Sequence, residues 1–147
     1  MANAHFLLVE STEQLIKKFP SYYIGEIDGS KSTSMKDFHE QIGQALQFPD
    51  YSGKNLDALD EMLNDLEWIE NSQVIVYISN SADWLTKEKD DQRILTILDI
   101  FDASAEDWKW MDDEDELPKK ELKIVFQNSE RIRKMLDTEE IPYALVD

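Results

Sequence analysis

The spacing of apolar residues changes several times along the chain, and each change marks a different predicted element. Short apolar runs rich in β-branched and aromatic residues predict strands over residues 5–10, 22–27, 74–78, 123–126 and 143–146. Apolar residues at every third or fourth position predict helices over residues 11–18, 35–46, 55–67, 90–103 and 129–136. Because strands and helices alternate, the pattern favours an α/β fold in which helices cover a mostly parallel sheet.

A tight turn is predicted directly before the helix at residues 55–67. Pro49, Asp50 and Gly53 favour a turn through a fixed φ angle, side-chain bonding to the backbone and tolerance of positive φ, respectively. Asn55 follows as a good N-cap, because its side chain can accept a hydrogen bond from the first turn of a helix. The sequence therefore places a helix immediately after a turn.

This predicted helix has an apolar side and an acidic side. The apolar side is expected to pack in the core and consists of Leu56, Leu59, Met62, Leu63 and Leu66. The other side carries Asp57, Asp60, Glu61 and Asn64, spaced so that three carboxylates project together. These acids suit the positive end of the helix dipole, so their simplest interpretation is a solvated helix face with favourable N-terminal charges.

A specific order of residues runs through the turn and the helix. A hydrophobe-Pro-acid-Tyr opening at residues 48–51 is followed by Gly53 and by Asn-Leu-Asp-Ala-Leu at residues 55–59. This order resembles the signature of the barstar family, which consists of small acidic intracellular inhibitors of secreted ribonucleases. A looser resemblance covers about residues 22–127 and implies a barstar-like fold with three core strands.

The two ends of the chain lie outside this family core. The strands predicted at residues 5–10 and 143–146 could extend the sheet to five strands, in an order that the sequence does not give. No linker rich in Pro, Gly or Ser divides a chain with only four Gly and four Pro. We therefore expect residues 1–147 to form a single domain.

The resemblance also implies a mechanism. In that family a helix and the loop before it enter the active-site cleft of a basic ribonuclease, where carboxylates of the inhibitor take the places of RNA phosphates. Arg and Lys in such a cleft bind planar anions well. The contact residues that the resemblance implies are Tyr51, Gly53, Asn55, Asp57 and Glu61. We add Asp60 and Asn64, which share the same helix face.

The chain departs from the family pattern on this face. Glu61 stands where the family has Asp, and Asp60 stands where it has tryptophan. Leu66 also replaces an aromatic residue, and Ser52 replaces a second tyrosine. These changes exchange aromatic contact area for negative charge, which favours a different target nuclease over the absence of a partner. The alternative is a barstar-like interaction module without a nuclease target, and the identity of the partner would distinguish the two.

Composition agrees with an inhibitor of a basic protein. The chain has 15 Lys and Arg against 32 Asp and Glu, a formal net charge of −17, which repels nucleic acid and attracts basic partners such as an extracellular-type ribonuclease or nuclease toxin. An acidic surface also simply maintains solubility. The chain has no cysteine, no segment typical of a signal peptide and no stretch long enough to span a membrane. We expect a cytoplasmic protein that does not bind membranes and is a monomer when free.

An acidic segment at residues 102–116 contains Trp108, Trp110 and Met111. Its simplest interpretation is a solvated loop whose tryptophans pack back on the core. The alternative is a second contact patch, because tryptophan often anchors protein interfaces and the neighbouring acids could meet a basic partner.

The sequence offers little for catalysis. His5 and His39 have no spacing typical of a zinc site or of a nucleophile with its base. Residues 28–32 end in Lys-Ser but lack the glycine spacing of a phosphate-binding loop, and the acidic run at 112–116 lacks the ligand order of a calcium loop. We therefore expect a protein that is not an enzyme, with no cofactor and no metal site.

Overall fold

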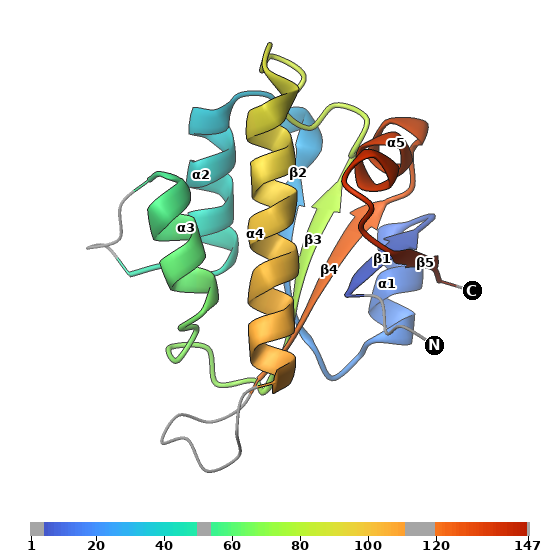
Figure 1. The fold of residues 1–147 in the computed structure, drawn as a ribbon. Helices are drawn as coiled ribbons and strands as arrows, with labels where there is room; N and C mark the ends of the chain where they lie inside the picture. The colour runs from blue at the N-terminus through green and yellow to red at the C-terminus, as the bar shows by residue number, and fades with distance from the viewer. Residues whose placement is uncertain (1–4, 50–53, 111–119, 147) are drawn as a thin grey trace.

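The computed structural model describes residues 5–49, 54–110 and 120–146, without the side chain of residue 110. Five strands form one sheet, namely β1 (Phe6–Val9), β2 (Tyr23–Asp28), β3 (Gln73–Ser79), β4 (Glu121–Gln127) and β5 (Tyr143–Leu145). All neighbouring strands pair in parallel, in the order β2-β3-β4-β1-β5 (Figure 1). The α/β prediction is confirmed, and the two terminal strands do extend the sheet to five.

Helices connect the strands. They are α1 (Thr12–Lys18), α2 (Met35–Ala45), α3 (Leu56–Leu63), α4 (Asp91–Trp110) and α5 (Glu130–Thr138), with a short 3₁₀ helix at Gly29–Lys31. A Ser or Asn side chain caps four of them by accepting a hydrogen bond from the backbone of the first turn, and these caps are Ser11, Ser34, Asn55 and Ser129. Among the described residues, no helix is both long and apolar enough to cross a membrane.

The two faces of the sheet are covered unequally. Buried residues of α2, α3, α4 and α5 join one large hydrophobic cluster, whereas α1 covers the opposite face with a smaller cluster around Leu15 (Figure 1). This distribution follows from the strand order, because the steps from β2 to β3, β4 and β5 all advance across the sheet in one direction. Only the step from β1 to β2 runs the other way, and right-handed crossovers then place its helix on the other face.

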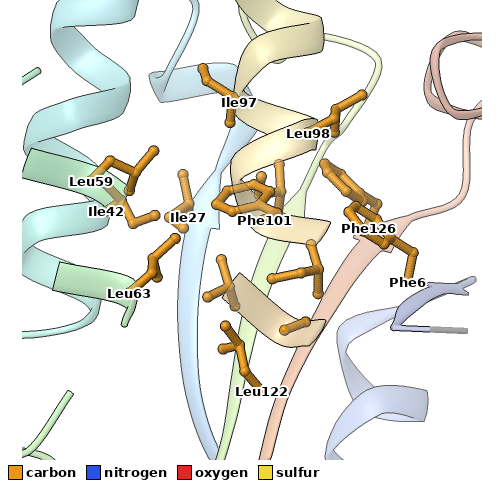
Figure 2. Packing of buried hydrophobic residues seen from close by; sticks show 14 of the residues in the cluster. Phe6, Ile27, Ile42, Leu59, Leu63, Ile97, Leu98, Phe101, Leu122 and Phe126 are labelled. Carbon is orange, nitrogen blue, oxygen red and sulfur yellow. The ribbon is translucent and has the colours of Figure 1, made fainter. Parts of the chain in front are cut away.

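The core is formed on both faces by alternating strand residues. In β3, Val74, Val76 and Ile78 face the large cluster, and Ile75 and Tyr77 face the small one. Nearly every residue of such a strand is hydrophobic, because both faces of the strand are covered. Figure 2 shows side chains of α4, including Ile97, Leu98 and Phe101, and of α2 and α3, including Ile42, Leu59 and Leu63, directed into this layer.

Two helix boundaries differ from the sequence prediction. The helix predicted over residues 55–67 ends at Leu63, and the chain turns at Leu66, which has a φ angle of 53° and is still fully buried. The helix predicted over residues 90–103 continues to residue 110, so residues 104–110 are helical where a loop was predicted. It continues because its apolar positions do, since Ala105 and Trp108 lie on the same buried side as Phe101.

Replacing Gly29 or Gly43 by alanine is expected to change stability in opposite directions. A methyl group on Gly29 would lie 2.7 Å from the carbonyl oxygen of Ser79, so the ends of β2 and β3 must separate. We expect Gly29→Ala to lower the free energy of unfolding by about 1–3 kcal/mol.

Gly43 provides the matched control, because it lies inside α2 and a methyl group there would lie 3.8 Å from its nearest neighbour, the side chain of Phe48. Gly43→Ala is expected to raise the free energy of unfolding by about 0.5–1 kcal/mol. Urea denaturation of both variants measures the two changes. A Gly29→Ala variant as stable as the wild type would contradict the close approach of the two strand ends.

Candidate functional site

The start of α3 is fixed by a side-chain cap. The Oδ1 atom of Asn55 accepts a hydrogen bond from the backbone nitrogen of Ala58 at 2.8 Å. Asp57 lies in the first turn, where its charge interacts favourably with the helix dipole. On the inner side, Leu59 and Leu63 are buried in the large cluster. The helix is therefore held at its start and along its buried side, and its other side faces solvent.

That free side carries the predicted acidic residues. Asp57, Asp60 and Glu61 are all exposed, as the i, i+3, i+4 spacing predicts, and we call them the α3 acids. Asn55 is exposed at the same end of the helix. The structure thus brings these four predicted contact residues together on one short helix.

Asn64 has an internal role that the sequence did not indicate. Its Nδ2 atom donates to the backbone oxygen of Asp60 at 2.7 Å and to the Asp60 carboxylate at 3.0 Å. The same atom lies 3.4 Å from the hydroxyl oxygen of Ser104 on α4. Asn64 is half-buried, and it therefore orients one of the α3 acids while linking α3 to the neighbouring helix.

Trp108 makes a second link between α3 and α4. Its side chain is only 3% exposed, and its Nε1 atom donates to the backbone oxygen of Leu63 at 2.8 Å. This bond satisfies a carbonyl group at the end of α3 that would otherwise lack a partner. The interpretation of Trp108 as a core residue is confirmed, and its interpretation as a surface contact is wrong. Residues 111–116 of the acidic segment, with Met111, lie outside the described residues.

The first turns of three helices enclose a recess beside the α3 acids. It has a volume of about 650 Å³ and is lined by Met35, Lys36, His39, Glu40, Lys54, Asn55, Leu56, Asp57 and Arg93. Asn55 and Asp57 therefore belong both to the recess and to the acidic side of α3. Sequence reasoning missed this feature because its walls come from α2, α3 and α4, and no spacing within one segment reveals it. We call it the α2–α4 recess.

Tyr51 and Gly53, the other predicted contacts, lie outside the described residues, so their position relative to α3 stays a prediction. Within the described ranges, no group of three or more His, Cys, Asp or Glu side chains could hold a metal ion. His5 pairs with Glu106, and His39 lies in the wall of the α2–α4 recess, where burial lowers its pKa. The two histidines contribute to different parts of the molecule.

The point where the strand order reverses is filled by the protein itself. Open parallel sheets commonly bind ligands there, beyond the carboxyl ends of the strands, and in this sheet the point lies between β1 and β4. The backbone nitrogen of Asn128 donates to Val9 at 2.8 Å, and its side chain donates to the Glu10 carboxylate at 3.0 Å. The backbone nitrogen of Glu10 donates to Gln14 at 2.8 Å. These bonds occupy the strand ends that a phosphate group would need.

A family model described as Barstar (barnase inhibitor) matches residues 22–127. The chain belongs to the barstar family. The match spans the same residues as the resemblance seen in the sequence, and it includes β2, α2, α3, β3, α4 and β4. This family is one of inhibitors, and its description implies a ribonuclease partner. In this barstar-family chain, β1, α1, α5 and β5 are additions outside the matched core.

No curated protein matches the chain in a sequence comparison. Among solved structures, it resembles Cdc6p from Pyrobaculum aerophilum with 11% identity and a TM-score of 0.53, covering 96% of this chain and 38% of that one. It also resembles a chain in the structure of Drosophila ORC bound to AT-rich DNA and Cdc6, with 14% identity, a TM-score of 0.51 and coverage of 95% and 47%. The chain spans less than half the length of these proteins. At such identities the likeness concerns the fold alone.

Removal of the Asn55 cap is expected to destabilise the start of α3. Asn55→Ala deletes the acceptor for the Ala58 amide, and we expect the free energy of unfolding to fall by about 1 kcal/mol. Asn55→Asp keeps an acceptor of the same length and should remain within a few tenths of a kcal/mol of the wild type. Urea denaturation compares the three proteins. Equal stability of Asn55→Ala and the wild type would show that this side chain does not hold the helix.

Proposed function

We propose that this protein is an inhibitor, of the immunity type, that binds a basic ribonuclease and blocks its active site with α3 and the loop before it. The observation that carries the proposal is the exposure of Asp57, Asp60 and Glu61 together on one helix of a barstar-family chain. In the complex these carboxylates take the positions of RNA phosphates. The protein contributes no chemistry of its own and acts by occupying the site.

Charge supports this proposal at two ranges. At contact distance, carboxylates form charge-assisted hydrogen bonds with Arg and Lys, which are stronger and shorter than bonds between neutral groups. At longer distance, a formal net charge of −17 steers a basic partner toward the molecule. The same net charge disfavours direct binding of nucleic acid, so the ribonuclease, and not its substrate, is the expected partner.

The seating of α3 supports the proposal in a second way. Binding costs less free energy when the contact groups are already ordered in the free protein. The cap at Asn55, the amide of Asn64 and the bond from Trp108 all hold α3 in place before any partner arrives. The Asp60 carboxylate is itself held by Asn64. A rigid acidic helix of this kind fits an inhibitor that competes with a flexible RNA strand.

The target differs from that of a family member with the usual pattern. Glu61 is one methylene longer than the Asp of the family, and Asp60 offers charge in place of the aromatic area of a tryptophan. Tyr51 and Gly53 complete the contact set in this proposal. A ribonuclease whose cleft presents more cationic groups, and less apolar surface, would fit the changed face. A non-nuclease partner on the same face would instead identify a barstar-fold interaction module.

Loss of two α3 acids is expected to weaken inhibition strongly. For Asp57→Ala/Glu61→Ala we expect affinity for the target ribonuclease to fall by roughly 100-fold or more, because each lost charge-assisted hydrogen bond is worth about 1.5–3 kcal/mol. The measurement is RNA cleavage by basic ribonucleases retained on the immobilised wild-type protein. Both side chains are exposed, so the variant should fold normally.

The control carries the same change of charge elsewhere. Glu13→Ala/Asp137→Ala removes two exposed carboxylates from α1 and α5 and should inhibit like the wild type. Equal loss in both double variants would point to net charge alone. Equal inhibition by the α3 variant and the wild type would remove α3 from the mechanism.

Salt is expected to weaken the complex mainly by slowing its formation. Between about 0.1 M and about 1 M salt the Debye length falls from about 10 Å to about 3 Å, which screens the long-range attraction. We expect the association rate constant to fall by more than about tenfold over this range, with a smaller change in the dissociation rate constant. Stopped-flow or surface-binding kinetics measures both. An association rate that does not respond to salt would contradict electrostatic steering.

A further inference from the structure

The described lining of the α2–α4 recess carries charges of both signs on a strongly acidic molecule. Its rim carries three cationic side chains, Lys36, Lys54 and Arg93. Two of them have a close acidic partner, since Lys54 lies 3.7 Å from Glu40 and Arg93 lies 3.4 Å from Glu88. Lys36 shares the rim with Asp57. Because Lys54 and Arg93 already have acidic partners, a charged ligand group would gain little from pairing with these two side chains.

The other described residues of the recess wall are apolar or neutral. Met35 and Leu56 are half-buried, and their inner surfaces pack against the large hydrophobic cluster. His39 is also half-buried, and its ring lies 5.6 Å from the ring of Phe38. Burial lowers the pKa of His39, which favours its uncharged form. The wall therefore combines a thioether, an aliphatic side chain and a neutral ring.

These properties favour one kind of occupant. Met sulfur and neutral rings pack well against aromatic side chains, and Lys or Arg on the rim can lie over an aromatic face. Concave sites of roughly 300–1,000 Å³ accept small-molecule ligands, and the recess of about 650 Å³ has ample room for one ring. Anchors that dominate protein interfaces are commonly aromatic side chains seated in such pockets.

We propose that the α2–α4 recess receives an aromatic side chain of the protein that docks on α3. The two features are continuous, because Asn55 and Asp57 line the recess and stand at the start of the acidic helix. A partner whose cationic cleft contacts Asp57 therefore also lies beside the recess. The inference rests on the proposed function for the identity of the partner, and it adds the residue type that this partner inserts.

The α3 acids and the recess have different roles in binding the partner. The α3 acids attract any sufficiently basic surface, whereas the recess distinguishes among such surfaces by requiring a ring at one position. It also supplies aromatic contact beside a helix that carries Asp60 where the family has tryptophan. Here the ring comes from the partner and the pocket comes from the inhibitor. The recess is thus the specificity-determining part of the interface.

The recess can be tested without the nuclease. Indole is titrated into the free full-length ¹⁵N-labelled protein and followed by two-dimensional NMR, with methylguanidinium as a charged probe. We expect saturable shifts from indole in amides of residues 35–40, 54–57 and 93, and none from methylguanidinium at these positions. Absence of saturable indole shifts there, or stronger binding of methylguanidinium, would overturn the inference whatever the partner proves to be.

A filled recess provides the second test. Lys36 is exposed on the rim, so Lys36→Trp can cover the recess with an indole of its own at little risk to folding. The matched control is Lys134→Trp, the same change beside a smaller recess of about 290 Å³ next to α5. We expect Lys36→Trp to abolish indole binding and to weaken inhibition of the retained ribonuclease by about tenfold or more, and Lys134→Trp to leave both unchanged.

The two tests separate this inference from the proposed function. If indole binds the recess and no ribonuclease is inhibited, the proposed function fails, while the recess remains an acceptor for an aromatic group. If a ribonuclease is inhibited equally by Lys36→Trp and by the wild type, the α3 mechanism stands and the recess has no part in the interface, so the inference is overturned. Loss of inhibition in Lys36→Trp alone supports both.

Discussion

The seating of α3 against α4 is the constraint on which the proposed interface depends. A helix of eight residues has little stability of its own, and α3 is held by its surroundings. The buried indole of Trp108 binds the carbonyl of Leu63 at one end, and Asn64 approaches Ser104 nearby. With Leu59 and Leu63 in the core, these contacts leave one orientation for the helix. The three acids are exposed as a consequence.

The strand order explains why function is expected on helices and not at the ends of the strands. Three successive crossovers in one direction place α2, α3, α4 and α5 on the same face, so that three of these helices begin around a shared recess. The usual ligand position between β1 and β4 is occupied by hydrogen bonds that Asn128 donates to Val9 and Glu10. Proteins of related fold can therefore differ in function, because the fold sets where surfaces lie and side chains decide what they bind.

Sequence reasoning succeeded where the signal was local. The spacing of Leu59, Met62 and Leu63 predicted which side of α3 is buried, and the position of Asn55 predicted where the helix begins. It failed where tertiary contacts decided. Leu66 continued the apolar spacing, but α3 ends at Leu63 and Leu66 itself has a positive φ, so the helix is shorter than predicted. The acidic stretch after Asp102 suggested a loop, although Trp108 lies on the buried side of α4.

The α2–α4 recess was beyond sequence reasoning for a different reason. Its wall combines residues such as Met35, Leu56 and Arg93, which are separated by 21 and 37 positions and meet only because three helices share one end of the sheet. No sequence motif describes a site whose residues come from three separate helices. The ion pairs of its rim were likewise hidden, since the sequence shows only a large excess of acids. The pairing of Lys54 with Glu40 appears only in the structure.

The most direct test of this account is amide hydrogen exchange of the protein, free and bound to a basic ribonuclease that it inhibits. The account predicts new protection concentrated at residues 55–64 and at the start of α2 and α4, with exchange in α1, α5 and β5 unchanged. Protection confined to those outer elements, with α3 exchanging as in the free protein, would contradict it.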